Sequence, residues 1–304
     1  MDIPLQTDSS LRANLLLLIT ALIWGLSFVA QRQGMEHMGP FTFNGARFMV
    51  GSISLLPVIF FLRRNRPVNR RTPLLSTGEI RGGLLLGAAL FLGASLQQIG
   101  IVETTAGKAG FITGLYVIIV PLLGLFWKQQ THFATWIGAV LAALGMYLLS
   151  ATDGLTLGRG DLLVLISALF WAIHVQLISW FSRRLDPLLL SFHQFFFCAL
   201  FSWLSALQWE EISSAGIGEG LFPILFTGIF SVGIAYTLQV IAQKRAHPAH
   251  AAIILSLESV FAVLGGWLFL HEILSLRGTM GCLLMLTGML LSQLLPYRDR
   301  SRVL

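Results

Sequence analysis

Residues 19–24 read ITALIW and residues 166–171 read ISALFW, so four of six letters recur after an interval of 147 positions. Both copies place a tryptophan within a long apolar run. Pro40 and Pro187 are separated by the same 147 positions. A short segment that recurs at a fixed interval indicates that the chain contains two diverged copies of one structural unit.

The repeat continues toward the end of each half. The segment AGKAGFITGLY (106–116) aligns with PAHAAIILSLE (248–258) at a shift of 142, and IGAVLAALGMYLLS (137–150) aligns with MGCLLMLTGMLLSQ (280–293) at a shift of 143. Loops of unequal length would produce such small changes of offset. Chance similarity is the alternative, because apolar helices draw on few residue types. The fixed order of the matches favours the repeat.

Composition places both copies in a membrane. Of the 304 residues 55% are hydrophobic and 11% are charged, whereas a soluble domain carries about 25% charged residues. Ten apolar stretches of 18 to 23 residues are each long enough, at ~1.5 Å per residue of helix, to cross a hydrocarbon layer of ~30 Å. The alternation typical of membrane strands does not occur. We therefore expect helices at 13–31, 43–62, 83–101, 106–127, 133–150, 161–181, 189–208, 221–242, 248–270 and 277–295.

Ten helices in two copies give five helices per unit. Because five is odd, the second copy enters the membrane from the opposite side. The predicted fold is an all-α membrane protein with ten transmembrane helices in two inverted-topology five-helix repeats, residues 1–152 and 153–304. Repeats of this kind are related by a pseudo-two-fold axis in the membrane plane. They can rock against each other around a central site, which is the usual basis of alternating access.

The distribution of basic residues predicts the orientation. Short loops on the cytoplasmic side of a membrane protein are enriched in Lys and Arg. Fifteen basic residues fall in one set of loops and tails and four in the other, so we expect both termini in the cytoplasm of a cell with the chain in its inner membrane. The larger set is Arg12, Arg63, Arg64, Arg66, Arg70, Arg71, Arg81, Lys128, Arg183, Arg184, Lys244, Arg245, Arg298, Arg300 and Arg302; the smaller is Arg32, Lys108, Arg159 and Arg277.

The net charge of +6 invites a nucleic-acid interpretation. The basic residues lie in short blocks between apolar stretches, which fits membrane orientation better, so we expect no nucleic-acid partner. Membrane lipids and a small-molecule substrate are the expected partners, and the sequence does not predict an oligomeric state.

Three segments carry a resemblance to a known family: ALIWGLSFV (21–29), ARFMVGSISLLPVIFFLRR (46–64) and AAIILSLESVFAVLGGWLFLHE (251–272). Over essentially its whole length the chain resembles an EamA-type member of the drug/metabolite transporter superfamily. The resemblance implies a ten-helix carrier of small metabolites, usually an exporter in bacterial members. Ser259 stands where the family often has proline, and Gln129 where it often has the acid that Glu272 supplies in the second repeat.

Two polar stripes are candidates for a substrate cavity. Trp24, Ser27 and Gln31 recur at helical spacing in the first predicted helix, and Trp171 and His174 do so in the sixth. Tryptophan usually lies at the membrane interface, but both indoles fall near mid-helix. A polar stripe facing lipid is costly, so each should face protein or a water-filled cavity. Interhelical packing is the alternative to a pair of aromatic cavity walls.

Glu258 is the acid that lies deepest within any predicted helix, and Tyr116 occupies the equivalent position of the first repeat. A carboxyl at this depth is expensive, which makes it a candidate for proton coupling, with His174 as a second titratable group. A structural hydrogen bond between helices is the alternative. Arg47 is predicted to extend its long side chain to the nearer membrane interface.

Other polar groups complete the candidate set. Gln97, Tyr236 and Gln239 could form gates or could pack helix ends. GLLLG (83–87) is a small-xxx-small pattern that predicts close helix packing within the bundle. AHPAH (246–250) offers two histidines without a third ligand nearby, so we expect no metal site, and no cofactor motif is present.

The sequence favours a secondary transporter, and specifically an exporter of small metabolites such as amino acids, their derivatives or amphiphilic drugs. It contains no GxxxxGK[ST] motif for direct use of ATP, and no GxSxG or HExxH motif of a hydrolase. We therefore expect no catalytic residues. A non-transporting receptor or assembly protein is one alternative, and a membrane-embedded enzyme is a weaker one.

Overall fold

The computed structural model describes residues 5–65, 73–103, 106–150, 158–262, 264 and 276–301, and these residues form helices and turns without strands. This confirms the all-helical class. The predicted repeat boundary at 152, Glu272, and the basic residues Arg66, Arg70, Arg71 and Arg302 lie outside the described residues. The helices are α1 (Leu5–Gly34), α2 (Pro40–Arg64), α3 (Thr77–Glu103), α4 (Ala106–Gly114), α5 (Tyr116–Phe126), α6 (Phe133–Ser150), α7 (Arg159–Phe181), α8 (Pro187–Trp209), α9 (Ser214–Glu219), α10 (Leu221–Phe226), the π-helix η2 (Thr227–Tyr236), α11 (Thr237–Gln243), α12 (Pro248–Leu255) and α14 (Leu276–Ser301).

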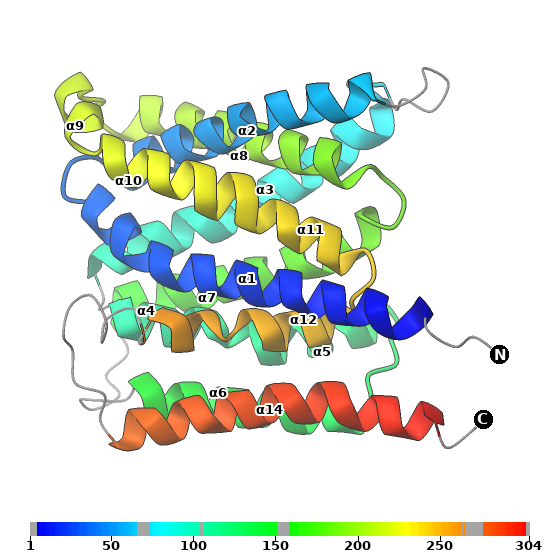
Figure 1. Cartoon of the computed structure of the whole chain (residues 1–304). Coiled ribbons are helices and arrows are strands. Elements are labelled where there is room, and N and C mark those ends of the chain that lie inside the picture. Colours follow the sequence, from blue (N-terminus) through cyan, green and yellow to red (C-terminus); the bar gives the residue numbers. More distant parts are fainter. Residues whose placement is uncertain are drawn as a thin grey trace.

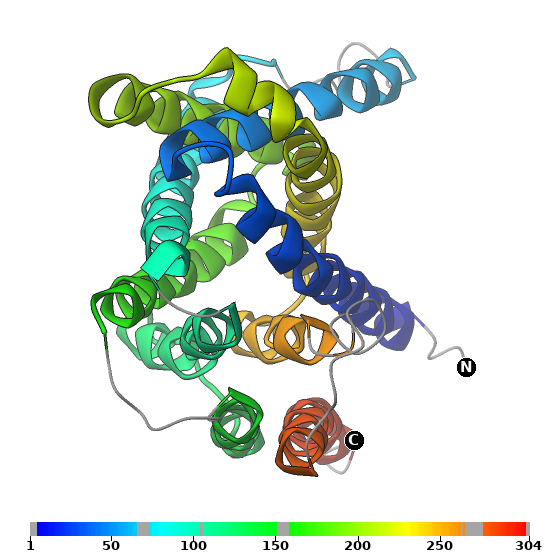
Figure 2. The same cartoon turned by 90° about the vertical axis from the view of Figure 1, so that its left-hand side faces the viewer.

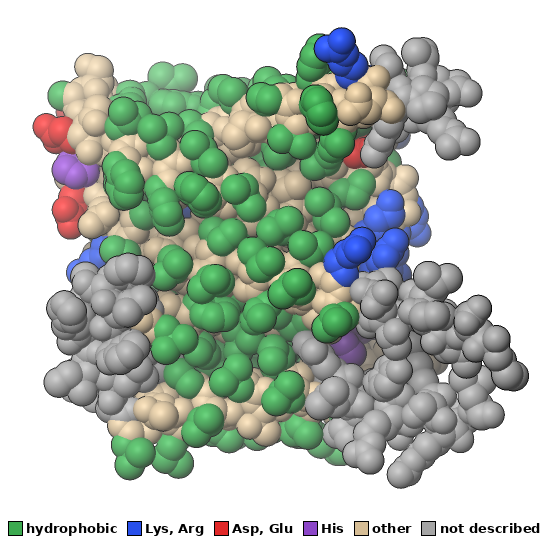
Figure 3. Space-filling model, in the orientation of Figure 1, with side chains coloured by type: hydrophobic (Ala, Val, Ile, Leu, Met, Phe, Trp, Pro, Cys, Tyr) green, Lys and Arg blue, Asp and Glu red, His purple; other side chains and the backbone are tan. Residues whose placement is uncertain are grey.

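The helices run between two ends of one bundle, and α1 begins at the same end at which α14 finishes (Figure 1). Seen from its left-hand side, the bundle surrounds a central region, with α6 and α14 as an outlying pair (Figure 2). Hydrophobic side chains cover the face between the two ends, and charged side chains gather at the ends themselves (Figure 3). This surface suits a hydrocarbon layer bounded by water on both sides.

Six of the described helices are long and apolar enough to cross a membrane, which makes the chain a multi-pass membrane protein. Four further apolar helices are shorter. The count of ten transmembrane helices stays a prediction. The six long helices are Leu11–Gly34, Pro40–Arg64, Thr77–Glu103, Arg159–Phe181, Pro187–Trp209 and Leu221–Gln243, and the shorter ones are Ile112–Phe126, Phe133–Gly145, Pro248–Ala262 and Leu276–Ser292.

Two of the predicted helices are interrupted, contrary to the expectation of continuous spans. The stretch 106–127 divides at Leu115 into α4 and α5. The stretch 248–270 is interrupted by a turn after α12 and is helical again over 258–262; its end lies outside the described residues. At both interruptions the backbone makes tighter bonds to the third preceding residue, from Leu115 N to Ile112 O and from Leu257 N to Ile254 O.

Local chemistry contributes to each interruption. Gly114, which is a poor helix former, precedes the first. At the second, the Ser256 hydroxyl donates to Ile253 O at 2.8 Å and so competes with the helical backbone. The stretch 221–242 is helical throughout, but its middle third, η2, is a π-helix, a wider form that is frequent at functional sites.

Glycines bring the central helices close together. Gly83 and Gly87 of α3 pack on α8, where a Cβ added at Gly87 would lie 2.7 Å from Phe197 Cβ. This confirms the packing role predicted for GLLLG. Gly51 of α2 packs in the same way against Val232 of η2. Helices from the two halves of the chain therefore pack with their backbones close together at these glycines.

The outlying helices α6 and α14 lie side by side (Figures 1 and 2). A Cβ added at Gly138 would lie 2.6 Å from Gly288 O, and one at Gly145 would lie 2.5 Å from Gly281 O. These four glycines let the two backbones touch at two points.

One end of the bundle is fastened by Glu210, which follows α8. Its carboxylate accepts hydrogen bonds from Phe41 N at 2.7 Å and from Thr42 N and Thr42 Oγ1 at 2.8 and 2.7 Å. These groups lie in the first turn of α2, where backbone N–H groups have no partner within the helix and the helix dipole favours an anion. A residue of the second half therefore caps a helix of the first.

We expect Glu210→Ala to lower the free energy of unfolding by about 1–2 kcal/mol, because it removes a charged helix cap. Thermal unfolding of the detergent-solubilised protein measures the change. Glu211→Ala, at the adjacent exposed carboxylate, is the matched control. Equal unfolding midpoints for the two variants would show that the cap does not stabilise the fold.

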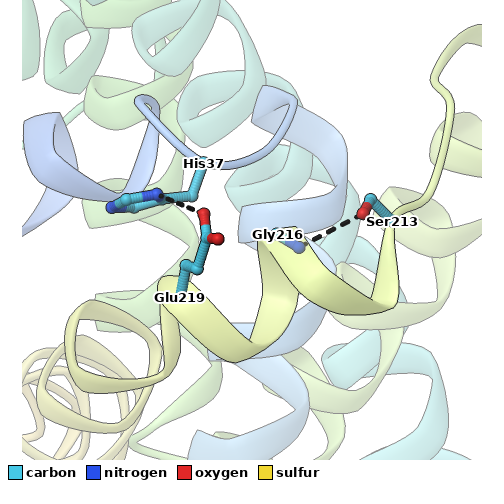
Figure 4. A network of polar contacts seen from close by, with 4 residues as sticks. All are labelled: His37, Ser213, Gly216 and Glu219. Carbon is cyan, nitrogen blue, oxygen red and sulfur yellow. Dashed lines mark hydrogen bonds and ion pairs between the residues drawn. The ribbon is translucent and has the colours of Figure 1, made fainter.

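A weaker contact lies at the same end (Figure 4). His37 Nδ1, in the turn between α1 and α2, is 3.3 Å from Glu219 Oε2 of α9. Ser213 accepts a bond from Gly216 N at 3.2 Å and so begins α9. Both partners of the His37–Glu219 pair are partly exposed, so its contribution to stability is small.

Candidate functional site

A cavity lies in the middle of the bundle, between residues of both halves of the chain. The volume open to water-sized molecules is about 40 Å³, which suits a few waters at most and is too little for a metabolite. The cavity is lined by Trp24, Phe28, Gln31, Arg47, Gln97, Thr113, Tyr116, Trp171, His174, Val175, Ser231, Tyr236, Gln239, Leu255 and Glu258.

Nine of the ten residues that the sequence singled out line this one cavity. The exception is Ser27, whose hydroxyl donates to Ile23 O of its own helix at 2.7 Å. Helical spacing places Ser27 on the same stripe as Trp24 and Gln31, but a short side chain that bonds its own backbone does not extend into the space. The nine are Trp24, Gln31, Gln97, Tyr116, Trp171, His174, Tyr236, Gln239 and Glu258.

Tyr236, the last residue of η2, stands between the two repeated tryptophans. Its ring centroid is 4.5 Å from that of Trp24 and 6.2 Å from that of Trp171, to which it is nearly parallel. Trp24 Nε1 donates to Ser231 O at 3.2 Å, which fixes that indole against η2. Three aromatic rings thus form a continuous apolar wall with favourable tilted and stacked geometry.

Several buried polar atoms of the lining have no hydrogen-bond partner among the described residues. They are Trp171 Nε1, His174 Nδ1 and Gln239 Oε1. Buried polar groups are almost always paired, so three such atoms around one space suit water or a polar ligand there. The other nitrogen of His174, Nε2, lies 2.9 Å from Gln194 Oε1.

Arg47 lies in the cavity wall and not at the membrane interface, so the predicted extension to the interface is wrong. The side chain is 2% exposed. Its Nε donates to Asn44 Oδ1 and its Nη1 to Gln31 Oε1, both at 3.0 Å. The guanidinium carbon is 4.8 Å from the ring centroid of Phe48. Amide oxygens and an aromatic face hold the guanidinium in place, because they partly replace its lost hydration.

No carboxylate of the described residues forms an ion pair with Arg47, and none of their cations pairs with Glu258. Glu258 is 5% exposed and follows the interruption after α12. The cavity thus presents one cationic and one acidic side chain, each buried and neither neutralised by the other. Either charge would be costly to bury without a counterpart.

The histidines of the AHPAH segment have other contacts. His247 Nδ1 accepts from Ala249 N at 3.3 Å at the start of α12, and His250 Nε2 lies 2.9 Å from Thr135 Oγ1. These contacts make His247 a helix cap and His250 a packing residue.

Comparison with known proteins identifies the family of the chain. The EamA-like transporter family model matches residues 11–151 and again 158–294. The chain belongs to the EamA-like transporter family. This confirms the resemblance to the drug/metabolite transporter superfamily and identifies the chain as a multi-pass membrane transporter.

Relatives agree with this membership, and a solved structure shares the fold. An uncharacterized transporter of Archaeoglobus fulgidus is 33% identical over 93% of this chain and 86% of its own length. The uncharacterized transporter YwfM of Bacillus subtilis is 27% identical over 95% and 96%. One crystal structure superimposes with a TM-score of 0.76 at 19% identity, over 94% of this chain and 98% of that one, which shows a shared fold.

Proposed function

We propose that this EamA-like protein is a secondary transporter that exports small metabolites by alternating access, with the central cavity as the cargo site. It is set in the inner cell membrane as ten helices in two inverted repeats, residues 1–152 and 153–304, with both termini in the cytoplasm. It catalyses no chemical change of its cargo.

The paired helix interruptions carry this proposal. The first falls at Leu115 and the second at Leu257, which are 142 positions apart, the shift that aligns the two copies here. The next residues, Tyr116 and Glu258, are separated by the same shift, and both line the cavity. Discontinuous helices that meet at a repeat interface near the membrane midplane are the usual construction of a transporter binding site.

The contacts of α6 and α14 support the inverted repeat. The 143-residue shift pairs Gly138 with Gly281 and Gly145 with Gly288. In space Gly138 meets Gly288, and Gly145 meets Gly281. Gly138 thus contacts the repeat counterpart of Gly145, and Gly145 contacts the repeat counterpart of Gly138. A two-fold axis between the two helices produces this pattern. The two separate family matches support the division into two units.

The lining suggests the class of cargo. Arg47 suits a carboxylate, Glu258 suits an ammonium or another hydrogen-bond donor, and the rings of Trp24, Trp171 and Tyr236 suit an apolar or aromatic part. Amino acids, their derivatives and many drugs are small amphiphiles of this kind. Export is the direction that the family resemblance favours.

Flux through the purified, reconstituted full chain tests the function. Ligands are first found by thermal shift with a panel of amino acids, their amides and amphiphilic amines, and are then loaded into proteoliposomes for exchange measurements. We expect exchange that saturates with ligand concentration. Ligands that stabilise the protein but never cross the bilayer would favour the receptor alternative.

Trp24→Ala and Trp171→Ala should each weaken cargo binding two- to tenfold, since an aromatic contact contributes about 0.5–1.5 kcal/mol beyond area burial. Trp24→Ala should also lower the unfolding midpoint, because it removes the bond to Ser231 O. Trp209→Ala, at an exposed indole distant from the lining, is the control. Unchanged affinity in both cavity variants would assign the tryptophans to packing alone.

Orientation follows from the fifteen-to-four split of basic residues. We expect a membrane-impermeant thiol reagent to label Glu211→Cys in intact cells and Lys244→Cys only after permeabilisation. Both positions are exposed and lie in loops or turns at opposite ends of the bundle. Cys282→Ala removes the partly exposed native thiol from the background. The opposite labelling pattern would invert the orientation.

A further inference from the structure

A second, larger cavity lies at the end of the bundle where α5 and α7 finish and α12 begins. Its volume is about 590 Å³, far more than that of the central cavity. Its wall combines two arginines, Arg183 and Arg184, with two tryptophans, Trp127 and Trp180. The central cargo cavity shares none of its lining residues, so the two are separate sites.

The charge in this cavity is of one sign. Arg183 and Arg184 are exposed, and no carboxylate lies in the described wall. The nearest acid in sequence, Asp186, accepts from Leu188 N at 3.0 Å and begins α8. Arg184 Nη1 donates to Trp180 O at 2.7 Å, and its guanidinium lies 4.3 Å from the centroid of the Trp180 ring. Arg184 is therefore held in place by a neutral neighbour, with donors left for an anion.

The pKa of His247 also reflects the positive charge in this cavity. His247 lines the same cavity, and burial together with the positive charge of Arg183 lowers its pKa. Arg183 and Arg184 thus gather positive charge beside His247 at the ends of two helices. An anion placed there would offset the repulsion between the two arginines.

The rest of the wall suits an amphiphile and not a free ion. Trp127 and Trp180 are 50% and 48% exposed, as expected of indoles at the level of lipid headgroups. Leu177 and Phe181 add apolar surface beside the arginines. Basic side chains gather at this end of the bundle, beside the hydrophobic face of the molecule (Figure 3). Basic pockets between helices at this level recognise phosphorylated lipid headgroups.

We propose that this cavity binds an anionic phospholipid, with the phosphate at Arg183 and Arg184 and an acyl chain against the tryptophans and leucine of the wall. A soluble phosphate compound shares the anionic group but lacks the acyl chain that the apolar wall would contact. The lipid is a partner distinct from the transported cargo.

Native mass spectrometry of the delipidated full chain tests this site, with phosphatidylglycerol and phosphatidylcholine of the same acyl chains. We expect the first phosphatidylglycerol to bind at least about tenfold more tightly, because each of the two arginines contributes about fivefold to the attraction of an anionic lipid. Arg183→Gln with Arg184→Gln should abolish most of this preference. Lys244→Gln with Arg245→Gln removes the same charge from exposed positions at the same end that do not line the cavity, and should change it less than twofold.

Three other outcomes would contradict the proposal that this cavity binds an anionic phospholipid. Equal binding of the two lipids, or equal loss of preference in both double variants, would mean that general surface charge attracts the lipid. Competition by glycerol 3-phosphate at the concentration that suffices for phosphatidylglycerol would assign the cavity to a soluble anion. Both double variants alter exposed side chains, and unchanged unfolding midpoints would show that each is folded.

Discussion

Glu258→Gln should abolish accumulation of cargo driven by a pH gradient while exchange of cargo between the two sides continues. Glutamine keeps the size and hydrogen-bonding capacity of the side chain but cannot carry a proton in and out. Glu258 is 5% exposed, lines the central cavity and has no cationic partner among the described residues. An acid in that position can bind a proton on one side of the membrane and release it on the other, as intramembrane acids do in proton-driven carriers.

The two assays are run on the same proteoliposomes, so a folding defect would lower both. His174→Gln tests the second titratable group of the cavity, whose Nδ1 has no partner within the described chain. We expect a smaller loss there, because His174 is held by Gln194. Accumulation by Glu258→Gln at the level of the unaltered protein would falsify the proton role and leave this glutamate as a structural residue.

Arg47→Gln should reduce affinity for cargo that carries a carboxylate by about a hundredfold and should, in the same protein, raise the unfolding midpoint. The loss follows because truncating one partner of a buried charge pair costs about 2–5 kcal/mol in binding. The gain follows because a buried guanidinium without an anion is costly in the empty cavity, and a neutral side chain removes that cost. A residue that served only to hold helices together would show the opposite change in stability.

Arg47→Lys is the matched variant. It keeps the charge but not the geometry that bonds Asn44 and Gln31 together. We expect it to retain part of the affinity and none of the added stability. A cargo analogue in which the carboxylate is an amide should bind the unaltered protein and Arg47→Gln alike. Equal loss of both ligands in Arg47→Gln would assign the residue to cavity shape.

Much of the fold follows from the sequence because hydropathy and repetition are carried by many residues at once. Eight of the ten apolar stretches are helical without interruption, and Pro40, Pro187 and Pro248 each begin a helix. The candidate cavity residues emerged because polar side chains within apolar runs must face away from lipid, and nine of the ten converge in space.

Three features of the structure could not be predicted from the sequence. Leu115 and Leu257 are ordinary helix formers, and a single glycine or serine beside them does not by itself predict where a helix is interrupted. Arg47 lies near enough to a helix end to reach water, and only its contacts with Gln31, Asn44 and Phe48 show that it turns inward. The position of the Tyr236 ring between the two tryptophans depends on the π-helix η2. A π-helix turns the following side chains to a different face from the one that α-helical spacing predicts.

The central claim is that one cavity opens in turn to each side of the membrane. Ser231→Cys places a thiol in the cavity wall with little change in size, in a background where Cys198→Ala and Cys282→Ala remove the native thiols. An impermeant thiol reagent is applied to right-side-out and to inside-out vesicles containing this protein. Alternating access predicts labelling from either side and loss of cargo exchange once the thiol is labelled. Labelling from one side alone, with exchange intact, would contradict it.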